Sequence, residues 1–207
     1  MAGPFSQTVT LHELGAELTY HPGMPDFLAK LRAGERGDAR LAQGAATWRG
    51  ELGWREFFAH VLAAHPRLAT ESFRREYDSL EWTAGPAADE VIAAWRMGQT
   101  GFLFVDAGMR QLVATGWMHN RARLVTASFL VKDAGVDWRR GESVYLDHLL
   151  DADTQQNNGN WQWVAGVGTD AAPYFRIFNP TLQARKFDPM VPMCANGCPS
   201  WRTCPMI

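Results

Sequence analysis

The chain has 207 residues, enough for one domain with its own hydrophobic core. Its net charge of −2 provides no overall basic surface for nucleic acid, so any contact with DNA must come from a local patch. No apolar stretch is long enough to cross a membrane and no leader pattern opens the sequence, so we expect a cytoplasmic protein without a membrane segment.

The first clear helical pattern begins at Glu51, after residues 1–48, which are rich in Gly and Ala and weakly patterned. The segment ELGWREFFAHVLAAHP predicts a helix with an apolar stripe that ends at Pro66. Glu51, Trp54 and Arg55 stand at i, i+3 and i+4, so they share one face of this helix. Taken alone, they indicate a solvated Glu–Arg pair beside a half-buried Trp.

Helical patterns continue through the middle of the chain, and no strand pattern of any length appears. A helix is expected over Ala87–Met97, and Asp106 is expected to cap the next helix, which ends at Gly116. Two more follow, in WMHNRARLVTASFLVKDAG and over Glu142–Leu150. The predicted fold class is therefore all-α.

The segment DADTQQNNGNWQW should open a further helix, because Asp153 can cap its first turn. Asp153, Asn157 and Trp161 recur at every fourth residue, so they form one ridge. A carboxylate, an amide and an indole make a poor core stripe, since an unpaired buried polar group costs about 1–3 kcal/mol. A planar polar ligand would supply partners. A surface helix with one exposed Trp explains the ridge equally well.

Other residues with binding chemistry give weaker signals. Arg121 and Arg176 could contact phosphates, but each alone reads as an ordinary surface arginine. His119 has no second ligand at metal-binding spacing, so we expect no metal there. All three cysteines lie in the tail MVPMCANGCPSWRTCPMI, where the absence of a fourth ligand argues against a zinc site.

Four segments occur in order: VDAGMRQLVATGWMHNRARLVTASFLVKD, DWRRGE, the ridge segment above and GTDAAPYFRIFNP. Together they resemble the flavin-binding half of the DNA photolyase/cryptochrome family, most closely a bacterial class I cyclobutane pyrimidine dimer photolyase. The resemblance divides the chain into an unmatched segment 1–48, a partial FAD-binding domain 49–189 and an unmatched tail 190–207. For the tail, our hypothesis is a frameshift, which the underlying DNA would test.

The resemblance implies a set of site residues. FAD would be held by Asn120, Arg123, Asp151, Asp153 and Asn157, with Arg123 and Asp151 paired beside the flavin ring. An electron would pass to the flavin along Trp82, Trp138 and Trp161, and Glu51 would also belong to the catalytic set. Trp54 and Trp163 would receive the flipped pyrimidine dimer, and Arg121 and Arg176 would contact the DNA.

The implied function is light-dependent repair of pyrimidine dimers by a monomeric deoxyribodipyrimidine photolyase that uses FAD and no metal. Glu51 and Asn157 favour repair, since signalling cryptochromes commonly differ from the family pattern at these positions. Leu124 departs from the Met usual in repair enzymes. Two alternatives remain open: a cryptochrome-like flavin photosensor and an inactive photolyase fragment.

Residues 1–48 contain no recognisable phosphate-binding loop and no antenna domain. The family's phosphate-binding loop would lie in this region. We therefore expect the chain to retain little FAD through purification, because the pyrophosphate would lack its usual donors.

Overall fold

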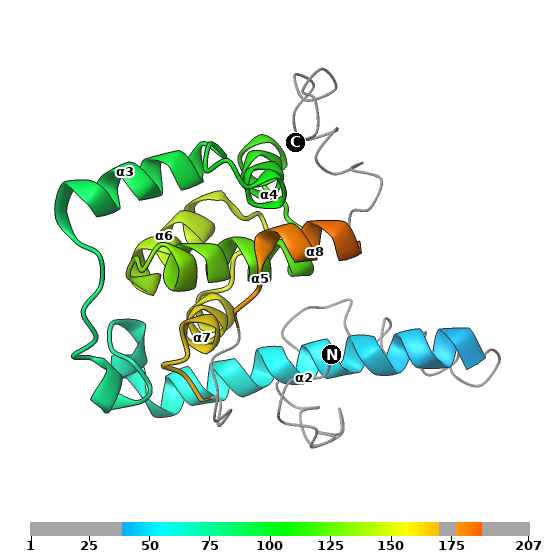
Figure 1. Ribbon diagram of the computed structural model, residues 1–207. Helices are drawn as coiled ribbons and strands as arrows, with labels where there is room; N and C mark the ends of the chain where they lie inside the picture. The colour runs from blue at the N-terminus through cyan, green and yellow to red at the C-terminus, as the bar shows by residue number, and fades with distance from the viewer. Residues whose placement is uncertain (1–38, 170–176, 188–207) are drawn as a thin grey trace. The chain divides into compact units, whose positions relative to one another are not determined.

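The computed structural model describes residues 39–169 and 177–187 (Figure 1). The chain divides into two units, Met1–Pro66 and Arg67–Ile207. The described part of the first unit is the long helix α2 (Ala39–Ala64) with the two residues that follow it, the second of which begins η2. This helix confirms the pattern seen from Glu51 but begins earlier, because the preceding segment is rich in Ala, Leu, Arg and Gln, which are good helix formers.

An aromatic cluster forms on α2. The ring of Trp54 lies 5.7 Å from that of Phe57 and 6.1 Å from that of Phe58, as expected for residues three and four positions apart on a helix. Arg55 pairs with its neighbour Glu56 at 2.9 Å. The solvated Glu51–Arg55 pair considered from the sequence is therefore replaced by a pair between adjacent residues.

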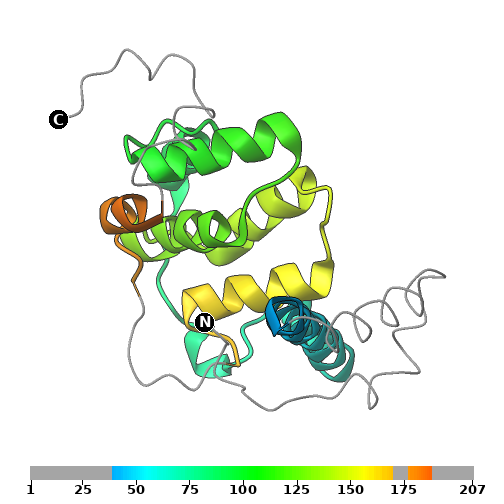
Figure 2. The ribbon, with the colours of Figure 1, turned by 90° about the vertical axis from the view of Figure 1, so that its right-hand side faces the viewer.

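The described part of the second unit contains helices joined by loops, with one isolated parallel bridge from Thr83 to Val136 and no strand. The all-α prediction is confirmed. Helices α5 and α6 lie between α3 and α4 on one side and α7 on the other, and α8 packs on α4 and α5 (Figures 1 and 2). The elements are η2 (Pro66–Ala69), η3 (Arg75–Tyr77), α3 (Gly85–Arg96), α4 (Leu103–Thr115), α5 (Asn120–Ser128), η4 (Phe129–Asp133), α6 (Trp138–His148), α7 (Thr154–Ala165) and α8 (Pro180–Phe187).

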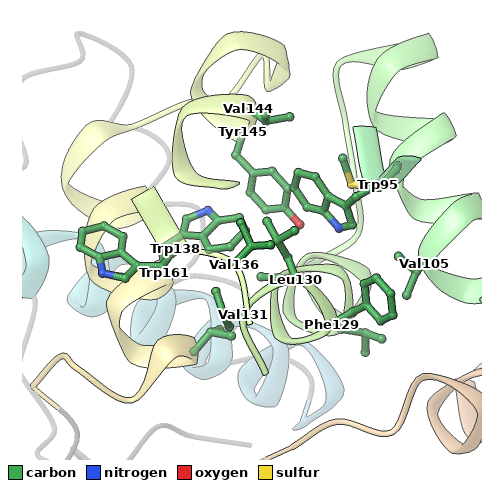
Figure 3. Close-up of a cluster of buried hydrophobic side chains, with 14 of the residues drawn as sticks. Trp95, Val105, Phe129, Leu130, Val131, Val136, Trp138, Val144, Tyr145 and Trp161 are labelled. Carbon is green, nitrogen blue, oxygen red and sulfur yellow. The ribbon is translucent and has the colours of Figure 1, made fainter. Parts of the chain in front are cut away.

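Trp95 anchors the core of the second unit. Its indole is fully buried, donates from Nε1 to the Thr126 carbonyl at 3.0 Å and stacks on Tyr145 with ring centroids 5.9 Å apart. The Tyr145 hydroxyl bonds to the Thr126 hydroxyl and also donates to the Arg123 carbonyl at 3.1 Å. Figure 3 shows Trp95 and Tyr145 in one cluster with Trp138 and Trp161. The core thus joins α3, α5, α6 and α7, with its buried polar atoms paired at Trp95 and Tyr145.

The start of α4 differs from the prediction. The helix begins at Leu103, and Asp106 lies inside its first turn rather than at its cap. The Asp106 carboxylate reaches back to accept from the backbone N–H groups of Thr100 at 2.8 Å and Gly101 at 3.0 Å. Asp106 therefore orders the loop before the helix. The predicted stop is confirmed, because Gly116 adopts a left-handed conformation with φ 68°.

Helix α5 ends in a π-helical turn, η4, which the sequence pattern did not reveal. The turn closes with the Ala134 N–H donating to the Phe129 carbonyl at 3.0 Å. It places Lys132 beside the last turn of α7, where its Nζ donates to the Ala165 carbonyl at 2.5 Å. Burial lowers the pKa of Lys132. A cation at a helix C-terminus is favourable, so the Lys132 contact that η4 makes possible stabilises the end of α7.

Candidate functional site

The predicted cap of α7 is confirmed. Asp153 has an extended backbone, and its Oδ1 accepts from the Gln156 N–H at 3.0 Å. The Asp153 carbonyl also accepts the first intrahelical bond, from the Asn157 N–H at 2.8 Å. This end of α7 therefore places Asp153 and Asn157 one turn apart, both half-buried.

We expect Asp153→Ala to lower the free energy of unfolding by about 1 kcal/mol, because the cap satisfies an N–H that the helix leaves unpaired. Urea unfolding followed by circular dichroism would measure the change. Thr154→Ala, an exposed substitution one residue later, is the matched control. Equal stability of Asp153→Ala and the unsubstituted chain would contradict the capping role.

The predicted pair of Arg123 and Asp151 is also confirmed. Arg123 donates from one terminal nitrogen to both oxygens of Asp151, each at 3.0 Å, and from Nε to the Met118 carbonyl at 2.7 Å. The Asp151 side chain is 57% exposed, so the pair lies at the surface of the second unit. Pairs this exposed contribute little to stability, and the role of this carboxylate in binding stays a prediction.

Asn157 is held by its amide nitrogen. Its Nδ2 donates to the backbone oxygen of Glu142 in α6 at 3.0 Å. Because a carbonyl only accepts, this contact assigns the orientation of the amide, whose oxygen can only accept. Asn120, the first residue of α5, is exposed one turn before Arg123.

Trp161 belongs to the core rather than to the surface of the ridge. Its indole is 2% exposed and contacts the rings of Tyr145 at 4.9 Å and Trp95 at 6.2 Å. A surface helix with an exposed Trp161 is therefore wrong. The ridge instead passes from the half-buried polar residues Asp153 and Asn157 into the core.

Trp138 and Trp161 lie in the same buried cluster (Figure 3), and Trp82 is partly buried against it. Neither Trp138 Nε1 nor Trp161 Nε1 has a hydrogen-bond partner among the described residues. The Arg139 guanidinium lies 4.6 Å from the centre of the Trp138 ring. The order of the three indoles along an electron path stays a prediction.

Sequence reasoning missed a buried polar chain behind α7. Glu142 Oε1 accepts from Asn158 Nδ2 at 3.0 Å, and Asn158 Oδ1 accepts from Gln162 Nε2 at 2.9 Å. Gln162 Oε1 in turn accepts from the Phe73 N–H at 2.8 Å. Burial raises the pKa of Glu142 to about 7. The available signal was the i, i+4 spacing of Asn158 and Gln162, one helical face away from the ridge.

Two kinds of feature are absent from the described ranges, 39–169 and 177–187. No three His, Cys, Asp or Glu side chains gather there closely enough to hold a metal ion. None of the helices there is both long and apolar enough to span a membrane.

The chain matches the model of one protein family, "FAD binding domain of DNA photolyase", over residues 48–205. It belongs to this photolyase family. The match begins beside the predicted boundary at residue 49 and continues past the predicted boundary at residue 189. The division of the chain at residues 48 and 189, and the frameshift hypothesis for 190–207, stay predictions, and residues 188–207 lie outside the described part.

Curated photolyases are similar over most of this chain. The deoxyribodipyrimidine photo-lyase of Escherichia coli is 54% identical over 144 residues, which are 69% of this chain and 30% of that protein. The enzyme of the same name from Halobacterium salinarum is 45% identical over 163 residues, 79% of this chain and 33% of that protein. The chain thus spans about a third of the length of these photolyases.

Solved structures show the same fold. A class III photolyase from Agrobacterium tumefaciens superposes with a TM-score of 0.74 at 42% identity, covering 81% of this chain and 35% of that chain. A cryptochrome from Synechocystis superposes with a TM-score of 0.76 at 33% identity, covering 86% of this chain and 36% of that chain. The same fold is therefore found in a photolyase and in a cryptochrome.

Glu51, from the predicted catalytic set, and the residues predicted to contact DNA belong to different helices, which are described one unit at a time. Glu51 is exposed and Trp54 half-buried on α2 of the first unit, whereas Trp163 is half-buried on α7 of the second. Arg121 lies over the rings of Phe178 and Phe187 at 5.8 and 4.7 Å, so it packs helix α8 in this chain. Arg176 lies outside the described residues. The contacts of these side chains with DNA stay predictions.

Proposed function

We propose that this chain is the FAD-holding part of a light-dependent DNA photolyase that acts on cyclobutane pyrimidine dimers. The observation that supports this most is the Arg123–Asp151 pair beside the start of α7, where Asp153 and Asn157 stand one turn apart. The pair was expected from resemblance to the photolyase family alone, and its two residues are 28 positions apart.

The donors and acceptors of this site fit a flavin. The flavin ring system offers an N–H group, carbonyl oxygens and ring nitrogens. Asp151 and the oxygen of Asn157 can accept from N–H groups, while Arg123 and Asn120 can donate to carbonyl oxygens and ring nitrogens. The exposure of Asp151 also fits, because a carboxylate at 57% exposure is accessible to a ligand.

Each residue then has a defined task. Arg123 fixes the Asp151 carboxylate beside the ring, and the Glu142 carbonyl fixes the direction of the Asn157 amide. When bound, FAD supplies the one-electron photochemistry. Trp161, Trp138 and Trp82 would supply an electron through the protein. The buried indole N–H groups of Trp138 and Trp161 have no described acceptor, which favours passing the electron on without loss of a proton.

A cryptochrome-like flavin photosensor is the second candidate. The similarity to the Synechocystis cryptochrome over 86% of this chain favours it. The presence of both Glu51 and Asn157 favours repair instead, because the family resemblance associates this combination with dimer-splitting members. An inactive fragment is the third outcome, distinguished by a failure to bind flavin.

Titration of the purified chain with FAD, followed by illumination with dimer-containing DNA, tests the proposal. Flavin binding with light-dependent dimer splitting supports the photolyase. Flavin binding without splitting supports the photosensor, and the absence of both supports the fragment. The flavin absorption spectrum and chromatography of the DNA products provide the two readouts.

We expect Asp151→Asn to weaken FAD binding by about tenfold or more, because it replaces a charge-assisted acceptor with a neutral one. Its effect on unfolding should stay below about 1 kcal/mol, since the carboxylate is exposed. Asp147→Asn, at an exposed position of α6, is the matched control for loss of one negative charge. Equal FAD affinities of the two variants would contradict the role of Asp151.

A further inference from the structure

A buried acidic residue contacts two consecutive asparagines of α7. Glu142 is 8% exposed and lies in α6. Its backbone oxygen accepts from Asn157 Nδ2 at 3.0 Å, and its side-chain Oε1 accepts from Asn158 Nδ2, also at 3.0 Å. Residue 142 therefore holds a half-buried amide of the candidate site and a fully buried amide of the core at the same time.

These two bonds restrain α7 more than either bond alone. Consecutive residues of an α-helix point about 100° apart, so a single bond at Asn157 would allow the helix to turn about its own axis. A second bond in a different direction, at Asn158, opposes this rotation. Gln162 extends the restraint by one turn, because it donates to Asn158 Oδ1 and accepts from the Phe73 N–H.

We propose that Glu142 is a positioning residue for Asn157. Its carboxylate sets the rotation of α7 and thereby the direction in which the Asn157 oxygen faces the candidate cofactor site. The proposal depends on the proposed function for the identity of the ligand. The contacts that support it belong to the ligand-free chain.

Helices α7 and α3 and the turn η4 pack against α6. Helix α7 contributes no charged side chain, since its sequence is TQQNNGNWQWVA. From α3, Asp89 pairs with Arg140, and from η4, Lys132 donates to the Ala165 carbonyl and Asp133 is exposed. The pKa of Glu142 is raised to about 7, mainly by burial. The Asn158 bond and Arg139 oppose this rise, and Asp137 adds to it.

The acceptor strength of Glu142 therefore changes around neutral pH. An ionised carboxylate is a stronger acceptor than a protonated one, so the Asn158 bond should weaken as the pH falls through about 7. Because Asn157 and Asn158 are consecutive residues of one rigid helix, the Asn157 amide should report this change.

Nuclear magnetic resonance of the full ligand-free chain tests the proposal through the Asn157 side-chain amide. We expect its signal to shift with an inflection near pH 7 in the unsubstituted chain and to lose this inflection in Glu142→Gln, which keeps an acceptor but cannot titrate. Glu142→Leu removes the acceptor and should speed exchange of the Asn157 amide protons about tenfold. Asp147→Asn on the same helix should leave both properties unchanged.

Two results would overturn the proposal: an inflection that persists in Glu142→Gln, or amide exchange in Glu142→Leu equal to that of the unsubstituted chain. If Glu142→Leu does not fold, Asn158→Leu tests the same bond from its other end and should give the same faster exchange. A chain that fails to bind FAD would defeat the proposed function while leaving this test intact. If FAD binds, Glu142→Leu should weaken binding more than Glu142→Gln.

Discussion

Gly141→Ala should destabilise the second unit by about 1–3 kcal/mol, the usual cost of adding a methyl group to a filled core. A Cβ at this position in α6 would overlap Trp161 Cη2 and lie 2.6 Å from Trp161 Cζ3 and 2.7 Å from Leu130 Cδ2. The indole cannot retreat, because Tyr145 and Trp95 pack against it. Urea unfolding of the full chain, followed by circular dichroism, measures the change.

As a control, the same change from Gly to Ala at Gly50 should not lower the free energy of unfolding. Gly50 lies in α2, and a Cβ added to it would meet no neighbouring atom within 4 Å. There the change from Gly to Ala should be neutral or should stabilise by up to about 1 kcal/mol, the helix propensity difference. A Gly141→Ala chain as stable as Gly50→Ala would show that Trp161 does not fill the space beside Gly141.

Raising the pH from about 4.5 to above 7 should reduce stability through Glu142, by up to about 3 kcal/mol. Its pKa is near 7 in the folded chain, compared with 4.5 for an ordinary glutamate. The folded state therefore binds the proton more tightly, so the stabilisation is complete below about 4.5 and is lost as the pH approaches 7. Thermal and urea unfolding across this pH range measure how the free energy of unfolding changes with pH.

Glu142→Gln isolates this contribution, because a neutral amide cannot titrate. We expect the variant to lose most of the decline between pH 4.5 and 7 and to be more stable than the unsubstituted chain at pH 8. The pKa of Asp78 is shifted in the opposite direction, because the Ser72 N–H lowers it. The stabilisation that Asp78 contributes is therefore lost as the pH falls. The same slope in both chains would mean that Glu142 is not buried in the folded state.

Local patterns predicted local structure well. The cap at Asp153 and the stop at Gly116 follow from preferences of single residues, and both are present. Asp106 shows the limit of this reasoning, because an acidic residue near a helix start can either cap the helix or reach back into the preceding loop. The choice depends on backbone geometry that neighbouring residues do not specify.

Contacts between distant residues required more than local patterns. The Arg123–Asp151 pair was expected through family resemblance, since neither residue alone indicates the other. The burial of Glu142 was missed, because a glutamate in a polar helical segment is ordinarily solvated. Its environment depends on Asn158 and on the packing of α6 against α7. The order of the tryptophans and the set of dimer-binding residues also depend on contacts between distant residues, and both stay predictions.

The π-helical turn η4 makes chain length in this region a structural variable. Such a turn contains one residue more than an α-helical turn. Deleting one residue from Phe129–Asp133 would restore a regular α-helix and rotate the following residues by about 100°. Lys132 would then point away from the Ala165 carbonyl. Deleting one residue of η4 would therefore remove the contact that holds the end of α7, although every side chain of the candidate site would be unchanged.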